Sequence, residues 1–208
     1  MERANADPAV VAAKRTRLSE PHVAPLVALA DRIAAAEGLD PGAVPYPDPS
    51  FGGVRARALV LLDNPGPRAK AGTGGSGLLS IENDDPTAAR AHAAYAYLGI
   101  DVAQCLHWNV CPFPTVKDNS TAGERARAVR WTGELLRLLP ALEAVVLLGR
   151  AAEDGWSRVR PRRPDLLVLV GPHPSNRGVN AAPGNAQLFG ATMRALAEHL
   201  AEPPRATG

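Results

Sequence analysis

Four short apolar segments, separated by segments with helical spacing, most strongly constrain the fold of this chain. The apolar runs lie at residues 58–62, 105–110, 144–148 and 166–170. Continuous runs of this length are typical of strands that are buried on both faces of a parallel sheet. We expect helices at residues 21–37, 86–98, 122–139, 150–158 and 186–200. This alternation predicts an α/β fold with three layers (α/β/α), built on a central, mainly parallel four-stranded sheet.

The two ends of the chain differ from this regular pattern. Residues 1–20 are polar and rich in alanine without a clear period, and we expect a flexible N-terminal extension there that either frays or forms a short helix. Residues 202–208 are expected to form a disordered tail. No repeat or linker divides the remainder, so residues 21–201 are predicted to form a single domain.

Composition narrows the class of protein. Apolar residues make up 46% of the chain, which is enough for a core and excludes wholesale disorder. The net charge of +2 permits binding to nucleic acid without requiring it. The two cysteines, Cys105 and Cys111, cannot supply the four thiolates of an iron–sulfur cluster. Neither a signal peptide nor an apolar run of membrane length is found, so we expect a cytoplasmic protein without membrane contact.

Three of the four predicted strands end in polar turns that contain proline. These turns span residues 63–67, 109–114 and 171–177. In open parallel sheets, ligands bind beyond the carboxyl ends of the strands. The three turns are therefore expected to meet at one cleft.

Each turn carries a side chain that suits a polar ligand. Asn64 precedes a proline that restrains its backbone, and its side-chain oxygen can orient a water molecule. The amide of Asn109 offers a donor and an acceptor, which can match the edge of a pyrimidine, such as the O4 and N3–H groups of uracil. His173 can donate to a carbonyl oxygen that gains negative charge. A structural role is the alternative for all three: a capped turn, a strand-end amide and a loop histidine.

Taken together, these turns resemble the motifs of the uracil-DNA glycosylase superfamily. The segment Leu62-Asp63-Asn64-Pro65-Gly66 is similar to the first motif, with leucine in place of the usual glycine. Its Asn-Pro-Gly form resembles the mismatch-specific uracil/thymine glycosylases. His173-Pro174-Ser175 matches the second motif. Residues 74–79, 108–112 and 146–151 resemble stretches of the iron–sulfur-type enzymes in the same order, so that the resemblance covers roughly residues 55–198.

The resemblance implies an enzyme that flips uracil or a related deaminated base out of DNA and hydrolyses its N-glycosidic bond. Asn64 would position the attacking water, and His173 would stabilise negative charge at uracil O2. The base-binding residues it implies are Asn109, Pro65 and Gly66. The DNA-binding residues it implies are Ser175, Asn176, Arg177 and Gly178. DNA is the expected partner, single- or double-stranded, for a nucleoid-associated monomer that needs no metal ion or cofactor.

Three departures from the family pattern bear on activity. The missing cysteines exclude the iron–sulfur subgroup. No Phe, Tyr or Trp occurs between Gly66 and Tyr95, where the family has a ring that stacks on the base, and Phe113 or Phe51 is the expected substitute. Asp63 adds a second candidate for activating water. Neighbouring residues of an extended segment usually face opposite ways, which favours Asn64.

Two other functions remain open from the sequence. The missing ring is compatible with a DNA-binding module that has the fold but little or no catalysis. The weak positive charge is compatible with a nucleoside or nucleotide hydrolase. The arginines at positions 158, 160, 162 and 163 form either a local DNA-binding patch or a solvated loop.

Overall fold

The predicted α/β architecture is confirmed by the computed structural model, which describes residues 3–71, 74–159 and 163–204. Four parallel strands form the central sheet in the order β4-β2-β5-β6. They are β2 (Ala58–Leu62), β4 (Cys105–Asn109), β5 (Ala144–Leu148) and β6 (Leu167–Gly171). β2 and β5 are central strands that are almost completely buried, as their continuous apolar sequences predict.

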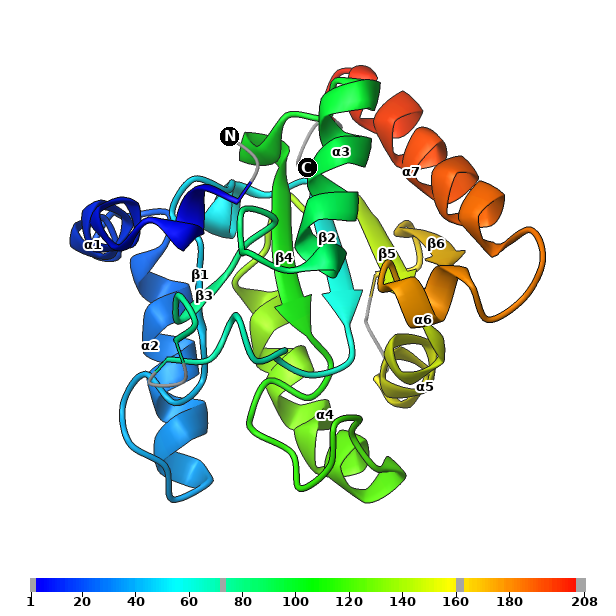
Figure 1. Cartoon of the computed structure of the whole chain (residues 1–208). Helices are drawn as coiled ribbons and strands as arrows, with labels where there is room; N and C mark the ends of the chain where they lie inside the picture. The colour runs from blue at the N-terminus through cyan, green and yellow to red at the C-terminus, as the bar shows by residue number, and fades with distance from the viewer. Residues whose placement is uncertain (1–2, 72–73, 160–162, 205–208) are drawn as a thin grey trace.

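Helices cover both faces of this sheet. They are α1 (Pro8–Thr16), α2 (Ala24–Ala36), α3 (Pro86–Leu98), α4 (Ala122–Arg137), α5 (Arg150–Arg158), α6 (Asn176–Val179) and α7 (Asn185–Ala201). In Figure 1, α3 lies in front of the sheet and α4 lies behind it. Three short 3-10 helices, η1 (Ala4–Ala6), η2 (Gly53–Arg55) and η3 (Val102–Gln104), complete the connections.

Two apolar cores hold these layers together, one on each face of the sheet. Leu59 and Leu61 point into the core shared with α2, α4 and α5, whereas Val60 points into the core shared with α3 and α7. This alternation follows from the two-residue period of a strand. The sheet is therefore a rigid platform, and its carboxyl edge positions the turns that follow the strands.

The N-terminal segment forms the short helix α1, one of the two alternatives expected from the sequence, and this helix is anchored to the domain. The Asp7 side chain accepts from the backbone N–H of Ala9 at 2.8 Å and so caps α1. Lys14, on this helix, is buried and forms ion pairs with Asp48 and Glu82. A buried ammonium group needs such partners, and these contacts fix α1 against two distant loops. The sequence around α1 has no periodic apolar pattern that would predict its attachment, because ion pairs rather than apolar contacts attach it.

Two short features also escaped sequence analysis. β1 (Tyr46–Pro47) and β3 (Leu78–Leu79) form a parallel pair of two residues each, which is too short to give a period.

At the C-terminus, Arg57 donates to the backbone oxygens of Leu200 and Glu202 at 3.1 and 3.0 Å. The expected tail begins at residue 202, and its residues 205–208 lie outside the described part. Within that part, no helix is both long and apolar enough to cross a membrane.

Candidate active site

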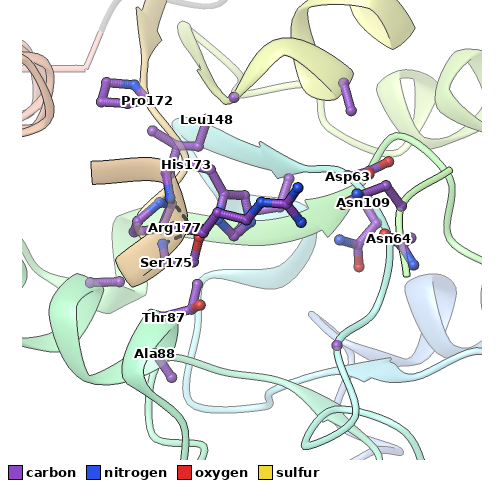
Figure 2. Close-up of a pocket in the computed structure, with 18 of the residues that line it drawn as sticks. Asp63, Asn64, Thr87, Ala88, Asn109, Leu148, Pro172, His173, Ser175 and Arg177 are labelled. Carbon is purple, nitrogen blue, oxygen red and sulfur yellow. Dashed lines mark hydrogen bonds between the residues drawn. The ribbon is translucent and has the colours of Figure 1, made fainter. Parts of the chain in front are cut away.

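A cleft of about 1600 Å³ lies where the turns after the sheet strands meet. Figure 2 shows Asp63, Asn64 and Asn109 on one side of it and His173, Ser175 and Arg177 on the other. The remaining predicted site positions that line the cleft are Pro65, Gly66 and Gly178. The three turns singled out in the sequence therefore converge on one cavity, as strands that end at the same edge require.

Asn109 lines this cleft with an amide whose oxygen is buried. It is the last residue of β4 and is 4% exposed. Its Oδ1 atom is buried without a hydrogen-bond partner among the described residues. Leaving a buried polar atom unsatisfied costs about 1–3 kcal/mol, so native structures rarely do so without a reason. A ligand that donates a hydrogen bond to Asn109 would remove this cost.

His173 is held so that one ring nitrogen is committed to the protein. The backbone N–H of Ser175 donates to its Nδ1 atom at 3.1 Å. Burial lowers the pKa of His173, with Asp63 and Asp85 acting in the opposite direction, so the ring is neutral at neutral pH. Because Nδ1 accepts, the single proton resides on Nε2. No hydrogen bond to Nε2 is found within the described residues, which leaves an N–H donor for a ligand.

Two glycines allow the His173 loop to pack this closely. Gly149 follows β5 with a φ of +96°, and a Cβ atom there would lie 3.0 Å from the Cβ of His173. A Cβ on Gly178 would lie 2.2 Å from the backbone oxygen of His173. Any larger residue at either position would push the imidazole from its place.

Arg90 of α3 ties the same loop to the opposite wall. It donates to the backbone oxygen of Pro174 and, at 2.9 Å, to Oδ1 of Asn176. Asn176 is thereby drawn away from the cleft and does not line it. Asn176 is exposed, and the expectation that it contacts DNA stays a prediction.

Asp63 and Asn64 both line the cleft. Asp63 is 8% exposed and accepts from the backbone N–H of Ser120 at 3.2 Å and from its hydroxyl group. Asn64 donates from Nδ2 to Thr115 Oγ1 at 2.8 Å. Both residues lie beyond the end of β2, in a bend where strand alternation no longer applies, and their side chains bind different partners, so both stay candidates for activating water.

The mouth of the cleft carries polar groups from α6. Ser175 precedes this helix, and its hydroxyl oxygen accepts from the backbone N–H of Gly178 at 3.1 Å. The hydroxyl proton remains able to donate to an anion. Arg177, in the same turn, is exposed and also lines the cleft.

The ring expected to cover a bound base is not supplied by Phe113. That residue is 1% exposed, lies in the core beneath α4, and has the guanidinium of Arg127 4.7 Å from its ring centroid. Phe51 is also buried and does not line the cleft. Full burial of a phenyl ring is worth about 1.5–3 kcal/mol, which favours the core over a solvent-filled cleft.

His107 is a buried titratable residue of the cleft that sequence analysis did not single out. It lines the cleft, is 8% exposed, and lies two residues before Asn109 on β4. The two-residue period of a strand was the available signal, since it places both side chains on one face.

Arg158 and Arg163, from the arginine group near position 160, do not line the cleft. Arg158 pairs with Asp154 at 2.9 Å, and Arg163 donates to the backbone oxygen of Leu142. Arg160 and Arg162 lie outside the described residues. No cluster of three or more His, Cys, Asp or Glu residues in the described ranges could hold a metal ion.

Comparison with known proteins adds no family to this picture. Neither the models of known protein families nor the curated protein sequences contain a match to this chain. Functional inference therefore depends on the geometry of the cleft.

Proposed function

We propose that this protein is a monofunctional DNA glycosylase that excises uracil or a related deaminated base. The observation that carries the proposal is the pair formed by the unpaired amide of Asn109 and the Nε2–H donor of His173, which line one cleft. Uracil presents a ring N–H flanked by two carbonyl oxygens. Asn109 can accept from N3–H and donate to O4, while His173 donates to O2.

The proposed reaction replaces the bond between C1′ of the sugar and N1 of the base with a bond from C1′ to a water oxygen. The bonding electrons leave with the base, and the charge spreads to O2, where the His173 donor stabilises it. Asn64, fixed by Thr115, orients the water through its free oxygen. The Asp63 carboxylate takes one proton from the water and returns it to the departing base.

The DNA partner follows from the same chemistry. The target base must first leave the stack, which costs a few kcal/mol in duplex DNA. Ser175 and Arg177 lie at the cleft mouth, where a hydroxyl donor and a guanidinium suit the phosphate groups that flank a flipped nucleotide. In this proposal the protein binds DNA as a monomer, in the cytoplasm and at the nucleoid.

Asn109→Leu tests the proposal, because leucine has a similar size but neither a donor nor an acceptor. Labelled single- and double-stranded oligonucleotides with one uracil are incubated with the protein and then cleaved with alkali at abasic sites. We expect the wild type to produce abasic DNA and the variant to be slower by at least about a hundredfold. Gln187→Leu, at an exposed amide on α7 outside the cleft, is the matched control.

Three outcomes would count against the proposal. An unchanged rate in Asn109→Leu would show that the amide does not read the base. Salt-sensitive DNA binding without release of any base would instead identify a binding module. Faster hydrolysis of free deoxyuridine than of DNA would identify a nucleoside hydrolase.

A further inference from the structure

His107 lines the cleft, as Asn109 does, but has no part in the reaction described above. In the sheet, His107 is in register with Val60 and Asn109 with Leu62, so both side chains lie on the same face of β4. Two residues along a strand span about 6.6 Å. His107 is therefore close enough to Asn109 to contact the same small planar ligand.

The His107 ring is held rigidly by two aromatic neighbours. Its centroid lies 5.2 Å from that of Phe51, with the planes inclined by 64°, and 5.7 Å from that of Tyr95. The Tyr95 hydroxyl lies 2.9 Å from Nε2. Burial lowers the pKa of His107 to about 4, so the ring is neutral at neutral pH and has one N–H donor.

The neighbours of Tyr95 determine which nitrogen carries that proton. Burial raises the pKa of Cys105 to about 12 and the pKa of Tyr95 well above 10, so both groups remain protonated. Tyr95 interacts with both the Cys105 sulfur and the His107 ring. Sulfur is a weak acceptor, whereas a neutral imidazole nitrogen is a good one. When the phenol donates to the better acceptor, Nε2, the His107 proton lies on Nδ1.

We infer that His107 determines base specificity by donating from Nδ1 to the carbonyl oxygen of the base held at Asn109. The inference rests on the proposed function and adds a residue to it. Within the described residues, Nδ1 has no hydrogen-bond partner. A deaminated base presents an oxygen where its parent presents an amino group, as O4 of uracil replaces the N4 amino group of cytosine. A fixed N–H donor attracts the oxygen and repels the amino group, and so favours the deaminated base.

The tautomer of His107 can be measured without any assumption about activity. Long-range ¹H–¹⁵N spectra of the full-length protein, labelled at histidine, distinguish a proton on Nδ1 from one on Nε2. We expect His107 to carry its proton on Nδ1, and free uracil to shift the His107 signals on titration. Tyr95→Phe should shift the tautomer balance, whereas Tyr97→Phe, at an 82% exposed site on α3, should not. A proton on Nε2 in the wild type would overturn the inference.

Excision assays then test the specificity role. His107→Phe keeps the ring but removes the donor, and it should slow uracil excision by about ten- to a hundredfold. It should also lower the preference for uracil over cytosine in otherwise identical oligonucleotides. His92→Phe, on α3 and outside the cleft, is the control. If His107→Phe does not fold, Tyr95→Phe carries the same test with a smaller expected loss.

The outcomes separate this inference from the proposed function. An active wild type with unchanged uracil rate and base preference in His107→Phe overturns the role of His107 and leaves the glycosylase proposal intact. A wild type that releases no base from any DNA contradicts the glycosylase proposal. For such an inactive protein, the titration with free uracil still tests the inference. Unchanged His107 signals would overturn it, and shifted His107 signals would support it.

Discussion

The backbone N–H of Ser175 donates to Nδ1 of His173 at 3.1 Å. This contact leaves Nε2–H as the donor that lines the cleft. A peptide N–H can only donate, so Nδ1 must accept and the single ring proton must lie on Nε2. A carboxylate at the same place would accept a proton from Nδ1 and favour the other tautomer. The geometry thus prepares a neutral hydrogen-bond donor at the position where we propose that the leaving base gains negative charge.

Loss of this donor should reduce catalysis more than binding. His173→Ala removes one stabilising hydrogen bond to the developing charge, for which losses of about 10²–10³ in rate are typical. Single-turnover excision of uracil from a labelled oligonucleotide measures the effect, and fluorescence anisotropy measures DNA affinity. His92→Ala should change neither quantity. A His173→Ala rate within a factor of about three of the wild type would contradict the assigned role.

The rate of excision should depend on pH in a specified direction. Burial lowers the pKa of His173 below its usual 6.5, so the neutral form persists through neutral pH. Protonation would place a second proton on Nδ1, opposite the Ser175 N–H, and would break the contact. We therefore expect kcat/KM to be flat from pH 6.5 to 8 and to fall in more acidic solution. A rate that increases on acidification below pH 6.5 would show that the imidazolium form is the active one.

Gly178 should tolerate no side chain. The methyl group of Gly178→Ala would overlap the backbone oxygen of His173, so we expect a loss of about 1–3 kcal/mol in unfolding free energy and a large loss of excision. Gly190→Ala is the matched control, because it lies inside α7 with open space around it. That substitution should stabilise the protein by about 0.5–1 kcal/mol. Equal effects in the two variants would disprove the packing argument.

His107 should make the protein sensitive to acid. Its pKa is about 4 in the folded chain against 6.5 in the unfolded chain, so the unfolded state binds the proton first as pH falls. Stability should therefore decrease between pH 6.5 and 4, by about 3 kcal/mol from this residue, and should not decrease further on its account below pH 4. His173 contributes in the same direction.

Urea unfolding at several pH values measures this dependence. The comparison uses the slope of unfolding free energy against pH, which is insensitive to any constant packing effect of the substitution. His107→Phe should have a clearly shallower slope between pH 6.5 and 4 than the wild type. A slope that survives unchanged in His107→Phe would mean that other groups bind the proton.

The central sheet and the position of the cleft were predictable from sequence because their signals are local. Runs such as 58–62 and 144–148 are too apolar to lie anywhere but the middle of a parallel sheet. The proline-containing turns after the strands must then meet at one edge. This is why Asn64, Asn109 and His173 could be expected to line one cleft before the fold was known.

The remaining differences arise from side-chain partners that are distant in sequence. Lys14 meets Asp48 and Glu82 only after folding, and Asn176 is turned away by Arg90 from another helix. The burial of Phe113 depends on how the segment after β4 passes beneath α4. No local pattern encodes such contacts, so the sequence indicated the site more accurately than it indicated each residue in it.

Direct detection of the released base tests the central claim. The full-length protein is incubated with DNA that contains one uracil, and the small-molecule fraction is analysed by liquid chromatography with mass detection. We predict free uracil in equal amount to abasic sites in the DNA, with release strongly reduced in Asn109→Leu and unaffected in Gln187→Leu. Intact DNA and no free base after prolonged incubation at high protein concentration, with uracil and with other deaminated bases, would contradict the account.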